Sequence, residues 1–201
     1  RGRAQLVANG RSGVPWRVAA NVALAPDHVR AAAQGTVNRI DFRFARPADI
    51  RKVGGDWRLA PATIVFPQGN VRLAGRYGDG LVVQTRMDGL DLSIVNAFAP
   101  ALGLGGKATG SLDFVQPSGA SFPRADARLT VEDFTRTGVA TFSEPVDIAF
   151  AGQLRPEGGS AGAVIRRNGA IIGRAQARLQ PLSPAAGSWT TRLLASPLSG
   201  G

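Results

Sequence analysis

Apolar and polar residues alternate along most of this chain. In the segment "IDFRF", Ile40, Phe42 and Phe44 fall on one side, and Asp41 and Arg43 fall on the other. The segments "WRVAANVAL" and "LVVQTRM" repeat this pattern. A period of two is typical of β-strands with one apolar and one solvated face. The pattern predicts an all-β, mostly antiparallel protein whose function resides in a surface rather than in a catalytic centre.

The strands are expected to follow one another through short turns. Residues 3–44 predict three or four strands, interrupted by a loop or one helical turn at 26–34. Hairpin turns are expected at Gly69-Asn70, Gly78-Asp79-Gly80 and Arg167-Asn168-Gly169, because glycine and Asn/Asp tolerate positive φ. Residues 46–56 form the first long connection, a candidate unit boundary within one continuous region, 1–201.

One segment departs from the period of two. In "DLSIVNAFAPALGL" the apolar residues fall three or four apart, which predicts a short helix over residues 92–99. Asp91 is the expected N-cap, and Pro100 with Gly103 is expected to end the helix.

Composition narrows the classes of function. The chain has 201 residues, 44% of them hydrophobic, and a net charge of +10. Its 24 Lys and Arg include only two lysines, Lys52 and Lys107, and they are spread along the chain. Such a distribution favours a solvated sheet face over a nucleic-acid site. Because there is no cysteine, disulfides and thiolate metal sites are excluded.

Candidate chemistry is sparse. "GLGGKA" matches G-x-G-x-x-A, but a helix precedes it and a strand follows, the reverse of a dinucleotide site. The only histidine, His28, is expected to be solvated in a loop beside Asp27. Paired carboxylates placed for acid–base chemistry are not evident. We therefore expect no enzyme activity and no cofactor.

The apolar positions of the predicted strands define one candidate surface. Periodicity alone leaves open whether it is the core of a closed sandwich or barrel or the lining of an open groove. Its expected members are Trp16, Val18, Val22, Ile40, Phe42, Phe44, Trp57, Leu59, Val71, Leu73, Leu81, Val83, Met87, Leu112, Phe114, Leu129, Val131, Ile148 and Phe150.

From Asp56 onward the chain resembles the periplasmic region of TamB proteins, the translocation and assembly module subunits of the AsmA-like superfamily. The resemblance is carried by "DWRLAPATI", "LAGRYGDG", "LDLSIVNAFAPALGLGGKATGSLDF", "FPRADARLTVEDFTR" and "WTTRLLASPLSGG". The first 50 residues match only in pattern. The family brings no catalytic residues with it.

The resemblance implies an elongated, curled sheet that forms an open trough with an apolar interior. It implies a periplasmic location, within a protein anchored in the inner membrane by a helix outside this segment. We therefore expect the chain to be a piece of a longer protein. The implied partners are phospholipid acyl chains and an Omp85-type outer-membrane barrel similar to TamA, bound through a region outside this piece.

Two functions follow as hypotheses. The first is a segment of a bridge that carries phospholipid from the inner to the outer membrane along the groove. The alternative is a scaffold for outer-membrane protein assembly or secretion, in which a free sheet edge adds a strand from a client. A basic nucleic-acid binder is disfavoured, because arginines do not cluster with aromatic residues.

Overall fold

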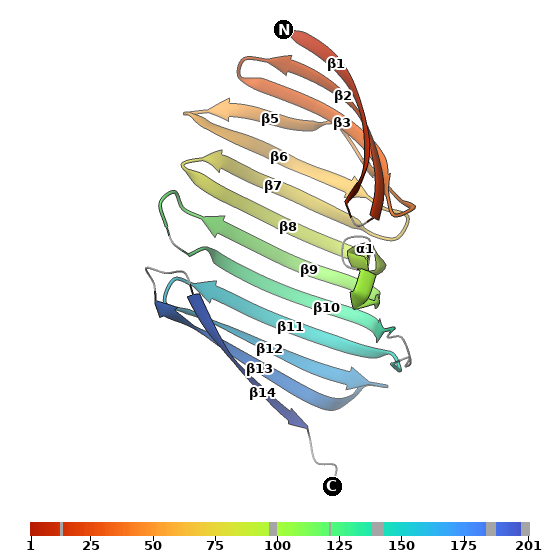
Figure 1. Ribbon diagram of the computed structural model, residues 1–201, viewed down its shortest axis with the longest axis vertical. Helices are drawn as coiled ribbons and strands as arrows, with labels where there is room; N and C mark the ends of the chain where they lie inside the picture. Colours follow the sequence, from red (N-terminus) through yellow and green to blue (C-terminus); the bar gives the residue numbers. More distant parts are fainter. Residues whose placement is uncertain (13, 97–99, 121, 138–142, 184–187, 198–201) are drawn as a thin grey trace.

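The all-β prediction is confirmed by the computed structural model of the chain (Figure 1). Its backbone is described for residues 1–12, 14–96, 100–120, 122–137, 143–183 and 188–197. In these residues one 14-stranded sheet forms, and every pairing in it is antiparallel. The strands follow in the spatial order β1-β2-β3-β4-β6-β7-β8-β9-β10-β11-β12-β13-β14, with β5 between β3 and β6. Sequence neighbours are therefore spatial neighbours almost throughout.

The strands are long for a sheet built by hairpins. They are β1 (Gly2–Ser12), β2 (Val14–Ala25), β3 (His28–Val37), β4 (Ile40–Phe44), β5 (Ala48–Val53), β6 (Asp56–Val65), β7 (Asn70–Gly78), β8 (Gly80–Asp91), β9 (Leu104–Gln116), β10 (Arg124–Arg136), β11 (Val146–Arg155), β12 (Gly158–Arg167), β13 (Ala170–Ser183) and β14 (Ser188–Pro197).

The connection expected at 46–56 is wrong, because β5 occupies most of it. β5 pairs with the first half of β3 and β4 pairs with the second half, so β4 and β5 lie end to end as one broken strand. The break falls at Arg46-Pro47, where proline cannot donate a ladder hydrogen bond. β5 also pairs with β6, so backbone hydrogen bonding continues across this region.

The loop or helical turn expected at 26–34 is also wrong. β3 begins at His28 and runs through this segment, and only Pro26 and Asp27 form the turn before it. The alanines Ala31, Ala32 and Ala33 carry no alternation, so the strand has little signal in the sequence. Pairing with β2 on one side and with β4 and β5 on the other outweighs that weak local preference.

The predicted hairpin turns are confirmed. β6 and β7 join at Gly69, which has φ of 90°, and β7 and β8 join around Gly80, with φ of 98°. Asn168 and Gly169 both have positive φ, 50° and 81°, as a two-residue turn with the twist of the flanking strands requires.

A helix lies within the segment predicted to be helical, residues 92–99. Helix α1 spans Ser93–Asn96 and is followed by a 3-10 turn, Pro100–Leu102. Residues 97–99 lie outside the described residues. Asp91 Oδ1 accepts a hydrogen bond from the Ser93 amide at 2.8 Å, as a capping residue does. The part of the chain that the structure describes contains no helix of the length and apolar character that a membrane crossing needs.

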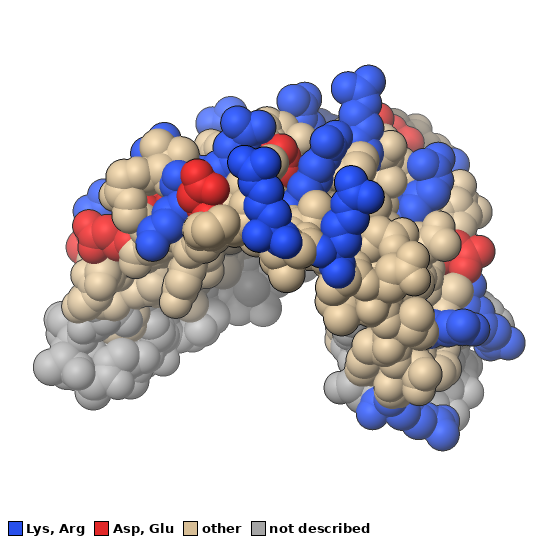
Figure 2. All heavy atoms as spheres, turned by 90° about the horizontal axis from the view of Figure 1, so that it is seen from above, with Lys and Arg blue, Asp and Glu red and all other residues tan. Residues whose placement is uncertain are grey.

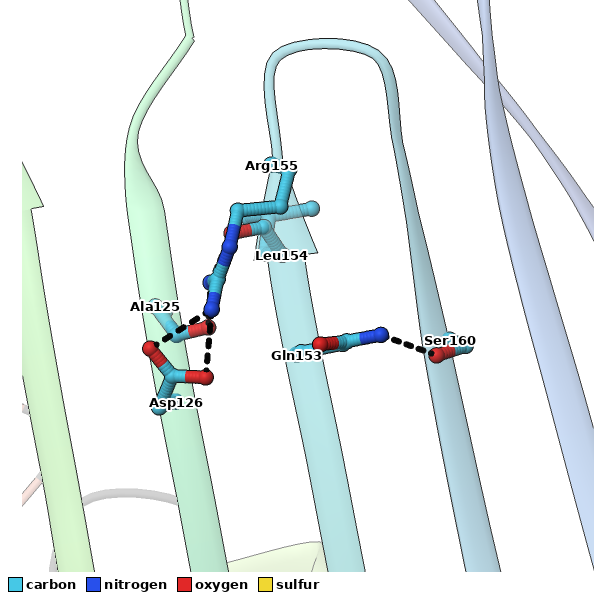
Figure 3. Close-up of polar contacts among 6 residues, drawn as sticks. All are labelled: Ala125, Asp126, Gln153, Leu154, Arg155 and Ser160. Carbon is cyan, nitrogen blue, oxygen red and sulfur yellow. Dashed lines mark hydrogen bonds and ion pairs between the residues drawn. The ribbon is translucent and has the colours of Figure 1, made fainter.

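Bulges interrupt the register of several strands, and those of β6 and β10 are examples. In β6, Ala60 and Pro61 have no register partner on β7, a position where proline is tolerated in a sheet. In β10 the register shifts after Glu132, and Asp133 has φ of 52°. Bulges increase local twist and bend a strand. Viewed from above, the molecule is an arch (Figure 2).

Candidate functional site

The candidate site is one face of the sheet, which we call the apolar face. Residues directly opposite each other in antiparallel strands share a face, and so do alternate residues of one strand. One row across the sheet links Ile64, Val71, Met87, Gly110, Leu129 and Phe150. A second links Leu59, Gly75, Val83 and Phe114. These rows run at right angles to the strands, from one strand to the next.

The register places every residue predicted for the lining on this face. They are Trp16, Val18, Val22, Ile40, Phe42, Phe44, Trp57, Leu59, Val71, Leu73, Leu81, Val83, Met87, Leu112, Phe114, Leu129, Val131, Ile148 and Phe150.

Sequence reasoning missed the part of this face on β12 and β13. Ala161, Ala163, Ala175 and Ala177 pair in the same rows as Phe150 and Gly152. Alanine and glycine contribute little to an apolar period, so the alternation of these strands is faint. The face of these alanines follows from their pairing with β11, and that pairing is known only from the register.

The side chains of the apolar face are covered incompletely. Of the described residues, only Ala48, Ala62, Ala108, Phe122 and Val131 count as buried hydrophobic. Leu81 is 38% exposed and Leu112 is 40% exposed. A second layer packed on this face would bury such large side chains.

The total surface area agrees with a single layer. The accessible surface of the chain is 13236 Å². A compact protein of 20.9 kDa exposes roughly 9,000 Å² by the usual scaling of area with mass. The excess of about 4,000 Å² is of the size expected when both faces of a long sheet contact solvent.

Some aromatic rings of the apolar face lie over glycines. Gly35 is opposite Phe42, and a Cβ placed on Gly35 would come within 3.0 Å of that ring. A Cβ on Gly10 would come within 2.7 Å of the Trp16 ring on the paired strand. Each ring therefore occupies the space of the missing side chain and leans along the sheet.

The other face, which we call the charged face, carries most of the arginines. Lys and Arg side chains stand mainly on the convex side of the arch (Figure 2). Arg86 pairs with Asp113 at 2.8 Å, and Arg76 pairs with Asp56 at 3.1 Å, in each case with the carboxylate on another strand. One lysine, Lys52, shares the apolar face by register, opposite Trp57. The two faces therefore differ strongly in charge.

His28 is not solvated in a loop, contrary to expectation. It is the first residue of β3, and its Nε2 lies 2.9 Å from Asp49 Oδ2. Arg51 Nε donates to the other oxygen of Asp49 at 2.8 Å. The hydrogen bonds from Arg51 and His28 lower the pKa of Asp49 to about 2. The Asp49 carboxylate is 27% exposed, so solvent screens the cluster.

A scan of protein-family models, a search of curated proteins and a search of solved structures each found no match to this chain. The resemblance to TamB proteins therefore rests on the sequence segments alone.

Proposed function

We propose that this chain is a segment of a periplasmic bridge that carries phospholipid between membranes, with acyl chains against the apolar face and head groups in water. The observation that carries the proposal is a one-sided apolar surface that continues from strand to strand and is only half covered. Soluble proteins rarely expose contiguous apolar patches of more than a few hundred Å². A surface this extensive needs an apolar occupant.

The geometry suits movement along the sheet. Adjacent strands lie about 4.8 Å apart, so the strand order spans roughly 55–60 Å before curvature is considered. That is about twice the ~30 Å hydrocarbon thickness of a bilayer. Each CH₂ of an acyl chain removed from water contributes ~0.8 kcal/mol, in contacts without preferred direction. A lipid can therefore exchange one row for the next at little net cost.

Site-specific crosslinking tests this proposal. Photocrosslinkers at Phe42, Val83 and Phe114 are expected to capture phospholipid in the full-length protein in membranes. Matched positions on the charged face are Arg43 and Gln84, each adjacent in sequence to a test position. Equal capture from both sets of positions, measured by mass spectrometry of the adducts, would contradict a lipid path on the apolar face.

A second candidate function is a scaffold for outer-membrane protein assembly with an Omp85-type barrel. The observation in its favour is that β1 is the first strand in the spatial order. Its outer backbone edge therefore has no partner strand among the described residues. Leu6 is 56% exposed and Val7 is 66% exposed on this strand. An exposed, apolar edge strand is a template for strand addition.

Two substitutions separate the candidates. Val7→Pro removes an edge amide, so the scaffold predicts loss of binding to a peptide from a barrel strand. Val83→Asp makes the apolar face polar and leaves the edge intact. Peptide binding that survives Val83→Asp but is lost in Val7→Pro would favour the scaffold, and peptide binding that survives Val7→Pro would rule against strand addition at β1.

A further inference from the structure

One rim of the apolar face differs in chemistry from the rest of that face. The register aligns five residues in a single row across β5 to β9, and we call this row the amphipathic rim: Lys52, Trp57, Tyr77, Leu81 and Gln116. It lies at the strand ends that the β5–β6 and β7–β8 turns join, and α1 lies at the other end of the strands (Figure 1). The rim combines a cation, two aromatic rings with a polar tip and an amide.

Polarity falls along the strands away from this rim. The next row across the same strands has no polar side chain, and it consists of Ile50, Leu59, Gly75, Val83 and Phe114. Near the other ends of β6 to β8 the row is Ile64, Val71 and Met87, also apolar. Lys52 is the only charged residue in these three rows of described residues. The rim is therefore polar where the row facing it across the sheet is apolar.

The polar groups of the rim are available to a ligand. Lys52 is exposed, and Tyr77 is 66% exposed. The Lys52 ammonium, the Trp57 indole N–H and the Tyr77 hydroxyl have no hydrogen-bond or ion-pair partner among the described residues. The carboxylate of Asp56, beside Trp57 in the sequence, is paired with Arg76 at 3.1 Å. A positive charge and two hydrogen-bond donors are thus left unused beside an apolar surface.

The position of Lys52 brings its charge to the margin of the sheet. Besides its place in the rim, it borders a hollow of about 600 Å³ together with Arg30 of the charged face. Lysine carries its charge at the end of a flexible apolar stem, so the stem can lie on the apolar face while the ammonium stays in water. This is the position in which a cation meets a ligand that is apolar at one end and anionic at the other.

The length of the strands fits the acyl chain of a lipid. On β7, Tyr77 of the rim and Val71 of the apolar row are six residues apart on the same face, which is about 20 Å. One leaflet contributes about 15 Å to the ~30 Å hydrocarbon core of a bilayer. A lipid with its head group at the rim therefore has its acyl chains over apolar rows when they lie parallel to the strands.

We propose that the amphipathic rim binds the phosphodiester of a glycerophospholipid, whose acyl chains lie along the strands toward Val71. Lys52 pairs with the phosphate, and Trp57 and Tyr77 donate to the glycerol and ester oxygens. Tryptophan, tyrosine and lysine occupy the same head-group level in membrane proteins. The proposal rests on the lipid path proposed above and adds the orientation of the lipid within it. Over β5 to β9 the lipid moves from strand to strand with its head group on one side of the sheet.

The orientation is tested by two crosslinkers on one strand. Benzoylphenylalanine replaces Tyr77 or Val71 in the full-length protein in membranes, and tandem mass spectrometry locates the lipid carbon to which it attaches. We expect attachment to the head group, the glycerol or the first acyl carbons from position 77, and to acyl carbons far from the ester from position 71. The same distribution of attachment from both positions, or the reverse one, would overturn the orientation and leave the lipid path intact. No lipid adduct from either position would overturn both.

The role of Lys52 is tested by a choice between two lipids. The full-length protein, with a crosslinker at Val83, is mixed with vesicles that contain phosphatidylglycerol and diacylglycerol with the same acyl chains. Lys52→Gln should lower the ratio of phosphatidylglycerol to diacylglycerol adducts about three- to fivefold, the loss of one exposed ion pair. Lys52→Arg should keep the ratio of the parent protein.

The matched control is Lys107→Gln, which removes the only other lysine of the chain. Lys107 is exposed on β9, and its register partners are Asp91 and Glu132. The adduct ratio should stay unchanged in this variant. An unchanged ratio in Lys52→Gln, or an equal fall in Lys107→Gln, would overturn the assignment of Lys52 to the phosphate. Circular dichroism verifies that the variants keep their strands.

Discussion

Replacing Val83 by aspartate measures whether the apolar face is open to water. Val83 lies in the middle of β8, with Gly75 opposite on β7 and Phe114 opposite on β9. Its side chain is of intermediate exposure. Aspartate at this position has a carboxylate where valine has two methyl groups, among residues of the apolar face.

The expected cost follows from partial burial. Fully burying a valine side chain is worth ~1.5–3 kcal/mol, so a half-covered one contributes about 1 kcal/mol. The poor fit of aspartate in a strand adds up to ~1 kcal/mol. On an open face water reaches the carboxylate, and the total loss is about 2 kcal/mol in the free energy of unfolding. In a closed core an unpaired carboxylate would add several kcal/mol more or become protonated.

Denaturant unfolding followed by circular dichroism measures this difference. We expect Val83→Asp to keep its β signal, to unfold at a lower denaturant concentration and to lose lipid capture. The matched control is Gln84→Asp, on the charged face of the same strand, which should lose no more than ~1 kcal/mol. Loss of the β signal in Val83→Asp would refute the open face. Unchanged lipid capture would refute the lipid path.

Three further substitutions test local features. Asn96→Ala removes two hydrogen bonds to the backbone of Leu104, at 2.7 and 2.8 Å, and should lower the free energy of unfolding in denaturant by about 1–3 kcal/mol. An unchanged free energy of unfolding would show that these two hydrogen bonds do not stabilise the fold. Asp49 has a pKa lowered mainly by Arg51, so its ionised form stabilises the fold above about pH 4 and this contribution is lost as the pH falls toward about 2. Asp49→Asn should flatten the pH dependence of unfolding in that window, and an unaltered profile would contradict the assignment. Gly35→Ala places a methyl group against the Arg17 backbone oxygen and the Phe42 ring, so the melting temperature should fall. An unchanged melting temperature would mean that β2 and β3 shift apart to make room for the methyl group without loss of stability.

The alternation of residues was enough to predict most of the sheet. In β8, Leu81, Val83 and Met87 share a face because successive side chains of a strand point to opposite faces of the sheet. This alternation is a local property of the backbone and does not depend on distant contacts. Turns at Gly69 and Gly169 were predictable for a similar local reason, since their φ values of 90° and 81° favour glycine.

Other features depend on contacts that a local pattern does not contain. β5 was missed because Pro47 precedes it and Lys52 interrupts its apolar side, and it is held by β3 and β6. The buried Phe122 lies between β9 and β10, outside any period, so its burial depends on how that connection folds back. A hollow of about 720 Å³ on the charged face is lined by residues of six successive strands, β8 to β13, and only the register brings them together.

The broken strand formed by β4 and β5 has a mechanical consequence. β6 joins this broken strand through two register pairs with β4 and four with β5, one group near each end of β6. Between the two groups, Ala60 and Pro61 of the β6 bulge have no register partner on β4, β5 or β7. Amide hydrogens at this point should therefore exchange faster than those of the ladders on either side, because local opening there breaks few contacts. The break and the bulge act together as a slot in a plate, at which the sheet can bend locally while the ladders at both ends of the slot hold it together.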